Sequence, residues 1–127
     1  MDFGAPFNIG AAAEAGGPLT ICSPRTGEPI PDGSGPMVWQ IMGRDAPSLK
    51  AAIGALARKN VSGELSDEDW RIQVAAVCVK SWPDSVMFNG APLPCTPENA
   101  LALLTVQREI ASEQIFPFAW ERTSFGD

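Results

Sequence analysis

The segment spanning residues 82–104 constrains the fold of this chain more than any other. Pro83 cannot continue a helix, because proline has no backbone N–H and its ring clashes with the preceding turn. Asn89-Gly90 is turn chemistry that tolerates a positive φ. Thr96 can cap a helix, and Pro97 suits the first helical position. The segment therefore predicts a helix, a proline-rich loop and a second helix, and it contains no histidine, no pair of metal ligands and no glycine-rich phosphate loop.

The residue pattern in the rest of the chain predicts an α+β fold. Residues 37–42 are rich in β-branched and aromatic side chains and are the strongest strand candidate, with a second candidate at residues 19–22. Apolar residues recur at helical spacing in the segments that follow. We expect a small N-terminal β-hairpin or meander over residues 19–43, packed against a three- to four-helix bundle. The expected helices span about residues 45–59, 66–82 and 97–120.

The chain length of 127 residues is that of one domain. We assign residues 1–18, which are rich in Gly and Ala, to an N-terminal arm and residues 19–127 to a single α+β domain. The helix expected over residues 66–82 has few strongly polar side chains after its first turn, so we place it at the centre of the core. Asp45 and Ser66 stand where the N-caps of the first two helices are expected. The residues of the central helix expected to be mostly buried are Trp70, Val74 and Val77.

The sequence carries no recognisable catalytic set. Histidine is absent, which removes the commonest general base and any Ser-His or Cys-His nucleophile. Cys22, Cys78 and Cys95 have no zinc-site spacing, and their odd number argues against a secreted disulfide framework. The acidic run at residues 67–69 is typical of a helix start, where carboxylates act as caps and dipole partners. We therefore expect no catalytic residue, no cofactor and no metal, with an acid-pair enzyme using that run as an alternative.

Charge and hydropathy narrow the choice of partner. The formal net charge of −6 disfavours a nucleic acid held through its phosphates. No signal peptide and no apolar run of about 20 residues is present, so we expect a cytoplasmic protein with no membrane partner. Aromatic side chains at the joint and near the C-terminus fit either the core or a contact patch, since large aromatics dominate both. The candidate protein-binding residues are Trp82, Phe88, Phe116, Phe118 and Trp120.

Four short stretches of the sequence together carry a resemblance. The first is Pro24-Arg25-Thr26-Gly27-Glu28-Pro29, and the second is Trp39-Gln40-Ile41-Met42-Gly43-Arg44-Asp45-Ala46. The third is the joint at residues 82–104, above all Pro94-Cys95-Thr96-Pro97-Glu98-Asn99-Ala100. The fourth is Glu113-Gln114-Ile115, followed by Phe118, Arg122 and Phe125. In their order and approximate spacing over about residues 19–125, these stretches resemble the tail assembly chaperones of long-tailed bacteriophages and prophages.

The resemblance implies a non-enzymatic role in viral tail morphogenesis. Proteins of that family bind the tape measure protein, keep its long hydrophobic helix soluble and help to recruit tail tube subunits. These two proteins are therefore the expected partners, with self-association of the chain as a further option. The expected location is the cytoplasm of the bacterial host, and the chain is expected to be absent from the mature virion. The alternative is another phage interaction protein, either a minor tail component or an inhibitor of a host defence complex.

Overall fold

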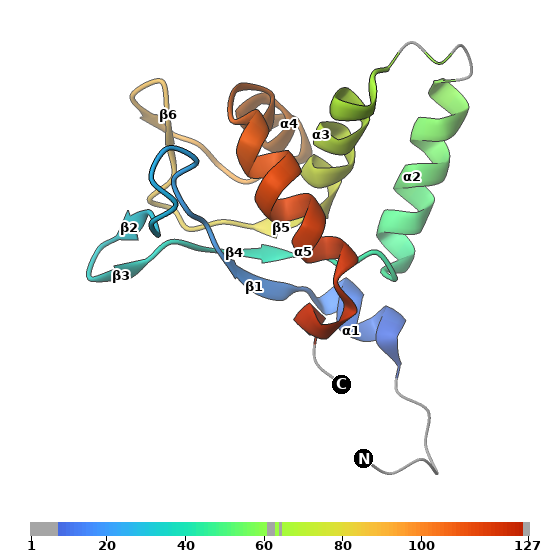
Figure 1. The fold of residues 1–127 in the computed structure, drawn as a ribbon, viewed down its shortest axis with the longest axis horizontal. Helices are drawn as coiled ribbons and strands as arrows, with labels where there is room; N and C mark the ends of the chain where they lie inside the picture. The colour runs from blue at the N-terminus through green and yellow to red at the C-terminus, as the bar shows by residue number, and fades with distance from the viewer. Residues whose placement is uncertain (1–7, 61–62, 64, 126–127) are drawn as a thin grey trace.

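The structure, a computed structural model, describes residues 8–60, 63 and 65–125. It is an α+β fold in which helices lie over a small antiparallel sheet (Figure 1). The sheet has the order β1-β4-β5 and consists of β1 (Gly17–Thr20), β4 (Val38–Ile41) and β5 (Val79–Ser81). Two short hairpins are formed by β2 (Pro31–Asp32) with β3 (Gly35–Pro36) and by β6 (Met87–Phe88) with β7 (Ala91–Pro92). The helical elements are α1 (Ile9–Ala15), α2 (Pro47–Lys59), α3 (Asp67–Cys78), α4 (Pro97–Val106), the π-helix η1 (Ile110–Ile115), α5 (Phe116–Trp120) and the 3-10 helix η2 (Arg122–Phe125).

The two N-terminal strands pair as the sequence predicts. Strand β1 runs antiparallel to β4, with Leu19 opposite Trp39 and Gly17 opposite Ile41. Trp39 and Ile41 are two residues apart, so they share one face of the sheet, and both are buried in the core. Between these strands the chain forms a turn at residues 23–28 and the β2–β3 hairpin, which together make a meander rather than a tight two-strand hairpin.

The helix expected over residues 66–82 ends earlier, at Cys78, because the chain then joins the sheet as β5. The carbonyl of Cys78 accepts a hydrogen bond from the backbone N–H of Met42 at 2.7 Å, and Val79 lies opposite Ile41. A β-branched residue such as Val79 suits this extended backbone. Pairing with β4 therefore overrides the helical pattern of the sequence.

Helix α3 nevertheless lies at the centre of the molecule, in contact with α2, α4, η1 and α5 (Figure 1). Val74 is fully buried, in agreement with the prediction. Trp70 and Val77 are of intermediate exposure and pack against the core, so they are mostly buried as predicted but less deeply than Val74. The packing of α3 is therefore tight on most sides and incomplete on one.

The helix expected over residues 97–120 is interrupted at Gln107 and contains a π-helical turn. The hydroxyl of Thr105 donates to the carbonyl of Leu101 at 2.6 Å, a bond of the kind that bends helices. Farther on, Pro117 has no N–H, and its ring would clash with the carbonyl of Glu113 in a regular α-helix. The wider turn of η1 directly precedes this proline and accommodates it.

Two of the three predicted N-caps are confirmed. The side chains of Thr96 and Ser66 each accept a hydrogen bond from the backbone N–H three residues on, at 3.1 Å. Asp45 is not the cap of α2, because that helix begins at Pro47 and its N-cap position makes no side-chain hydrogen bond. A carboxylate from α1 takes over this role.

Glu14 of α1 supplies that carboxylate, and its Oε1 accepts a hydrogen bond from the backbone N–H of Ser48 at 2.9 Å. This hydrogen bond lowers the pKa of Glu14 below its ordinary value. Ala13 of the same helix is buried, and β1 begins at Gly17. Residues 8–18 of the predicted arm are therefore part of the fold, whereas residues 1–7 lie outside the described residues.

We expect Thr96→Ala to lower the free energy of unfolding by about 1 kcal/mol, because one N–H at the start of α4 loses its acceptor. Thr105→Ala is the matched control in the same helix, and it should be neutral or slightly stabilising because its hydroxyl bonds back to a carbonyl. Urea unfolding of both variants measures the difference. Equal losses in the two variants would contradict the assignment of Thr96 as the cap.

Candidate protein-binding surfaces

Trp82, the first of the predicted binding residues, lies in the core and not on the surface. Its side chain is 8 % exposed, and its ring centroid lies 5.0 Å from that of Trp39. Its indole N–H donates to the carbonyl of Leu93 at 2.7 Å, across the loop that follows β5. The prediction of a binding role is wrong for Trp82, because the chain leaving β5 brings its ring against β4. Through its contact with Trp39 and its hydrogen bond to Leu93, Trp82 holds the proline-rich loop against the sheet.

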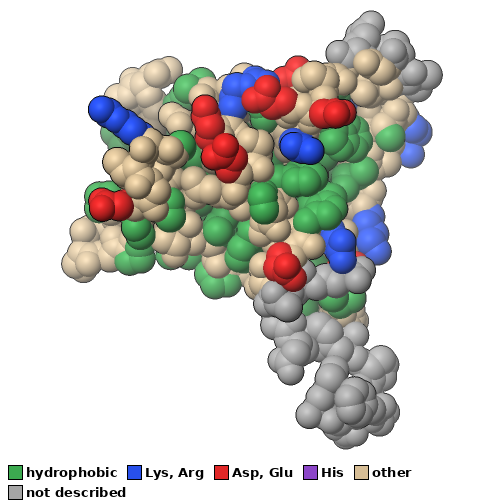
Figure 2. All heavy atoms as spheres, in the orientation of Figure 1, with side chains coloured by type: hydrophobic (Ala, Val, Ile, Leu, Met, Phe, Trp, Pro, Cys, Tyr) green, Lys and Arg blue, Asp and Glu red, His purple; other side chains and the backbone are tan. Residues whose placement is uncertain are grey.

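Phe116 and Trp120 form a stacked pair on one side of α5. Their ring centroids are 4.3 Å apart with an interplanar angle of 13°, and both side chains are half-buried. The guanidinium of Arg71 on α3 lies over the Phe116 ring, 5.8 Å from its centroid. Figure 2 shows hydrophobic side chains gathered between α5 and α2. The stack is the part of the predicted aromatic set that fits an apolar surface.

Phe118 has a structural role on a different side of α5. Its ring packs edge-on against Phe125 of η2, with centroids 5.4 Å apart. The two rings lie against glycines of the sheet region: a Cβ added to Gly43 would lie 2.6 Å from the Phe125 ring, and one added to Gly17 would lie 3.4 Å from the Phe118 ring. Phe88 is elsewhere again, half-buried in β6. The structure therefore does not bring the five predicted residues into one patch.

A groove that the sequence analysis missed runs along α3 between α2 and α4. It consists of three adjoining hollows of about 270, 230 and 230 Å³. The central hollow shares Leu56 and Gln73 with one neighbour and Val77 and Pro97 with the other. Leu101 of α4 completes the central lining. We call this feature the α2–α4 groove.

Incomplete packing of α2 leaves the groove open. The fully buried residue of α2 is Leu49, near its start, whereas Ile53 and Leu56 are half-buried. Across the groove, Leu101 is 38 % exposed. In the sequence, Leu56 and Leu101 sit in ordinary helical apolar stripes, so the pattern alone could not distinguish them from core residues.

The charged residues of the groove lie at separate points along it. Lys59 lines the hollow next to the end of α2, and Glu98 lines the central hollow from the first turn of α4. Lys80 lines the third hollow and donates to the carbonyl of Glu14 at 2.8 Å. Apart from Gln73, the floor of the groove is therefore apolar, and charges of both signs lie at its borders.

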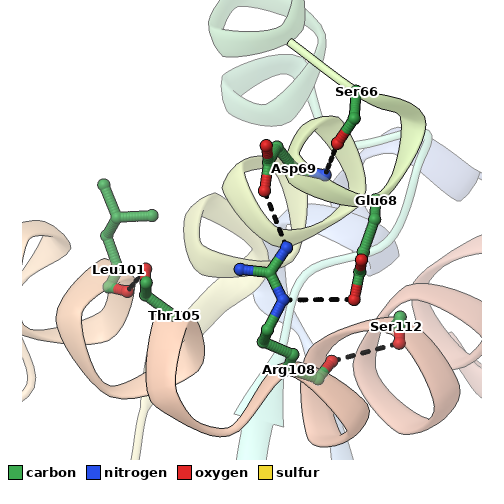
Figure 3. Close-up of polar contacts among 7 residues, drawn as sticks. All are labelled: Ser66, Glu68, Asp69, Leu101, Thr105, Arg108 and Ser112. Carbon is green, nitrogen blue, oxygen red and sulfur yellow. Dashed lines mark hydrogen bonds and ion pairs between the residues drawn. The ribbon is translucent and has the colours of Figure 1, made fainter.

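The acidic run at the start of α3 is engaged by an arginine. Arg108 lies just after the break in the fourth helix, and its Nη2 is 2.7 Å from Asp69 Oδ1 while its Nε is 3.1 Å from Glu68 Oε1 (Figure 3). These contacts tie the chain after α4 to the first turn of α3. The Arg108 guanidinium, together with the Ser66 hydroxyl, lowers the pKa of the Asp69 carboxyl. Arg108 thus acts as a structural brace that favours the ionised form of Asp69.

The thiols are poorly suited to nucleophilic chemistry. Burial raises the pKa of Cys78 to about 12 and also raises the pKa of Cys95. A thiol is reactive when its pKa is lowered and its sulfur is accessible. Among the described residues, no group of three or more acidic, cysteine or histidine side chains is placed to hold a metal ion.

Comparison of the chain with protein-family models, with curated proteins and with solved structures found no significant match. None of the helices in the described part of the chain has the length and apolar character needed to cross a bilayer. Function is therefore inferred from the resemblance of the four stretches and from the surfaces described above.

Replacing Arg108 with Gln should lower the melting temperature at pH 7. In acid, where Asp69 is protonated, the substitution should no longer lower it. The folded-state pKa of Asp69 lies below its ordinary value of 3.8, so the stabilisation is present above that value. It is lost as the pH falls below 3.8 and through the lowered folded pKa. The measurement is the difference in melting temperature between the wild type and the variant as a function of pH.

Arg71→Gln is the control for this experiment, because the guanidinium of Arg71 lies over an aromatic ring. Any effect of that substitution should stay constant across the same acidic range. A difference for Arg108→Gln that does not change between neutral and acidic pH would contradict the brace.

Proposed function

We propose that this protein is a non-enzymatic tail assembly chaperone of the long-tailed phage type, which binds an apolar helix of the tape measure protein in the α2–α4 groove. The open apolar groove is the observation that carries the proposal. The four stretches that resemble the tail assembly chaperones supply the identity of the partner. Recruitment of tail tube subunits, action in the host cytoplasm and absence from the mature virion follow from the same resemblance.

The shape and lining of the groove favour a helix as the occupant. Two of its walls are helices, and along α3 its floor is made by Ala76 and Val77 with one polar side chain, Gln73. An amphipathic helix fills such a groove with anchors spaced three and four residues apart. The borders add a charge requirement, since Glu98 favours a basic residue on the partner and Lys59 favours an acidic one.

The best of the resembling stretches lies at the groove. Cys95, Thr96, Pro97 and Glu98 all contribute to its lining. The cap of α4 by Thr96 fixes where this stretch turns into the helix that carries Leu101. Binding in the groove would therefore involve residues that carry the resemblance to the tail assembly chaperones.

The remaining chemistry of the chain fits a binding protein better than an enzyme. The buried thiols have raised pKa values, and two of the three acids at the start of α3 are paired with Arg108. An acid-pair enzyme would require those carboxylates to face a substrate. Their present partners are the brace and the helix cap.

The test is co-expression with a phage tape measure protein, using Leu101→Arg to place a charge in the groove. The arginine would stand one turn after Glu98, so the helix itself should not be weakened. We expect at least a tenfold loss of affinity, about 1.4 kcal/mol, and a matching loss of soluble tape measure protein. Quantitative co-purification and titration of a tape measure helix measure both effects.

Val106→Arg is the matched control, because Val106 lies in the same helix, is 61 % exposed and does not line the groove. It should bind as the wild type does, and circular dichroism should show both variants folded. Equal binding by both variants would exclude the groove. Failure of the wild type to co-purify, together with its presence in mature particles, would instead identify a minor tail component.

A further inference from the structure

A second cavity lies at the opposite side of α4 from the groove, at the end of the molecule that carries the two short hairpins (Figure 1). Its volume is about 370 Å³, at the lower end of the range of about 300–1,000 Å³ found for ligand pockets. Its apolar lining includes Ile21, Met37, Trp39, Val86, Phe88 and Leu103. The two hairpins are linked by a hydrogen bond of 2.7 Å from the Ser85 hydroxyl to Asp32 Oδ1. We call this cavity the hairpin pocket.

Trp39 lines this pocket and has an unused hydrogen-bond donor. The residue is 2 % exposed, and its Nε1 is buried with no hydrogen-bond partner among the described residues. The neighbouring indole of Trp82 is satisfied by the carbonyl of Leu93. A buried donor without an acceptor is unfavourable, so an acceptor that reached it from the pocket would remove that penalty.

We propose that the hairpin pocket binds one apolar side chain of an extended polypeptide segment, whose main-chain carbonyl accepts the hydrogen bond of Trp39 Nε1. An extended segment has free main-chain carbonyls, whereas a helix has engaged its own. The volume of the pocket suits one or two side chains rather than a whole helix. The occupant therefore differs in conformation from the helix proposed for the α2–α4 groove, and this site does not depend on that function.

The border of the pocket provides both movement and polar contacts. Met87 is 54 % exposed and Met37 half-buried, and methionine side chains adapt readily to a new neighbour. Because Trp39 Nε1 is buried, neighbouring side chains must shift before the carbonyl can reach it. Ser23 and Gln107 also line the pocket and can bond to the main chain of the segment. An apolar lining with a few polar groups is typical of a built binding site.

The probe is N-acetyl-leucine-N′-methylamide, which offers one leucine side chain between two peptide groups. The four tryptophans of the chain give four indole N–H signals in a nitrogen-edited proton spectrum, and Trp39→Phe identifies the one from Trp39. We expect a saturable downfield shift of the Trp39 signal during titration. The Trp82 signal is the internal control and should stay in place, because its proton is already bonded.

Two comparisons decide the outcome. N-acetyl-glycine-N′-methylamide has the same peptide groups without the side chain, and it should produce no saturable shift. Binding of the leucine probe to Trp39→Phe, followed through the Met87 methyl signal, should be about fivefold weaker, since one hydrogen bond is lost. An unmoved Trp39 signal at saturating probe, an equal response to the glycine compound or undiminished binding by Trp39→Phe would each overturn the proposal.

Met87→Glu provides a second variant in case Trp39→Phe does not fold. Met87 lies exposed at the border of the pocket, so a charge there should block the probe while the fold remains intact. Val106→Glu is the control on α4 and should leave the titration unchanged. An unchanged titration with Met87→Glu would also overturn the proposal. Leu101→Arg should not affect it, which separates this site from the α2–α4 groove.

Discussion

Close packing around α3 is the constraint on which the rest of this structure depends. The buried side chains that α3 presents to its neighbours are mostly small, among them Val74, Ala75 and Cys78. Small side chains let α4, η1 and α5 approach this helix closely, and an interior at that density tolerates little added volume. The same helix then supplies β5, so one continuous segment fixes both the helical layer and the third strand of the sheet. Helix α2 also packs against α3, but Leu49 is its only fully buried side chain among the described residues, so its packing is incomplete.

Local chemistry explains which parts of the fold the sequence could predict. The caps formed by Thr96 and Ser66 depend on backbone groups only three residues away. The formation of strand β4 depends on the β-branched and aromatic residues within it. Two of the errors involve partners distant in the chain. Helix α3 ends at Cys78 because Met42 takes its carbonyl, and α2 is capped by Glu14 across the interface between α1 and α2. The spacing of apolar residues within one helix does not show which distant residue contacts it.

The candidate site was less predictable than the fold, because apolar side chains have the same sequence pattern in a core and on a binding surface. Trp82 looked available for binding and is buried against Trp39. Leu101 looked like a core position and is exposed in the groove. What separates these cases is which neighbour covers the side chain, and that depends on the tertiary arrangement of α2, α3 and α4. The unpaired indole of Trp39 is likewise visible only once its surroundings are known.

The two helices that form the walls of the α2–α4 groove are packed against the core to different extents. This difference affects how a partner could bind reversibly. The α4 wall has buried Leu103 and Leu104, and Arg108 ties the chain beyond it to α3. The α2 wall is anchored near its start by Leu49 and the Glu14 cap, while the end next to Lys59 is held by half-buried side chains. Local opening costs least where few apolar contacts are buried, so the free end of α2 is the part that can adjust to an incoming helix. In the proposed binding of a tape measure helix, ordering that end would use part of the interaction free energy and keep the affinity moderate. A chaperone that must release its helix as the tail tube grows requires such a balance, with one wall fixed and the other adaptable.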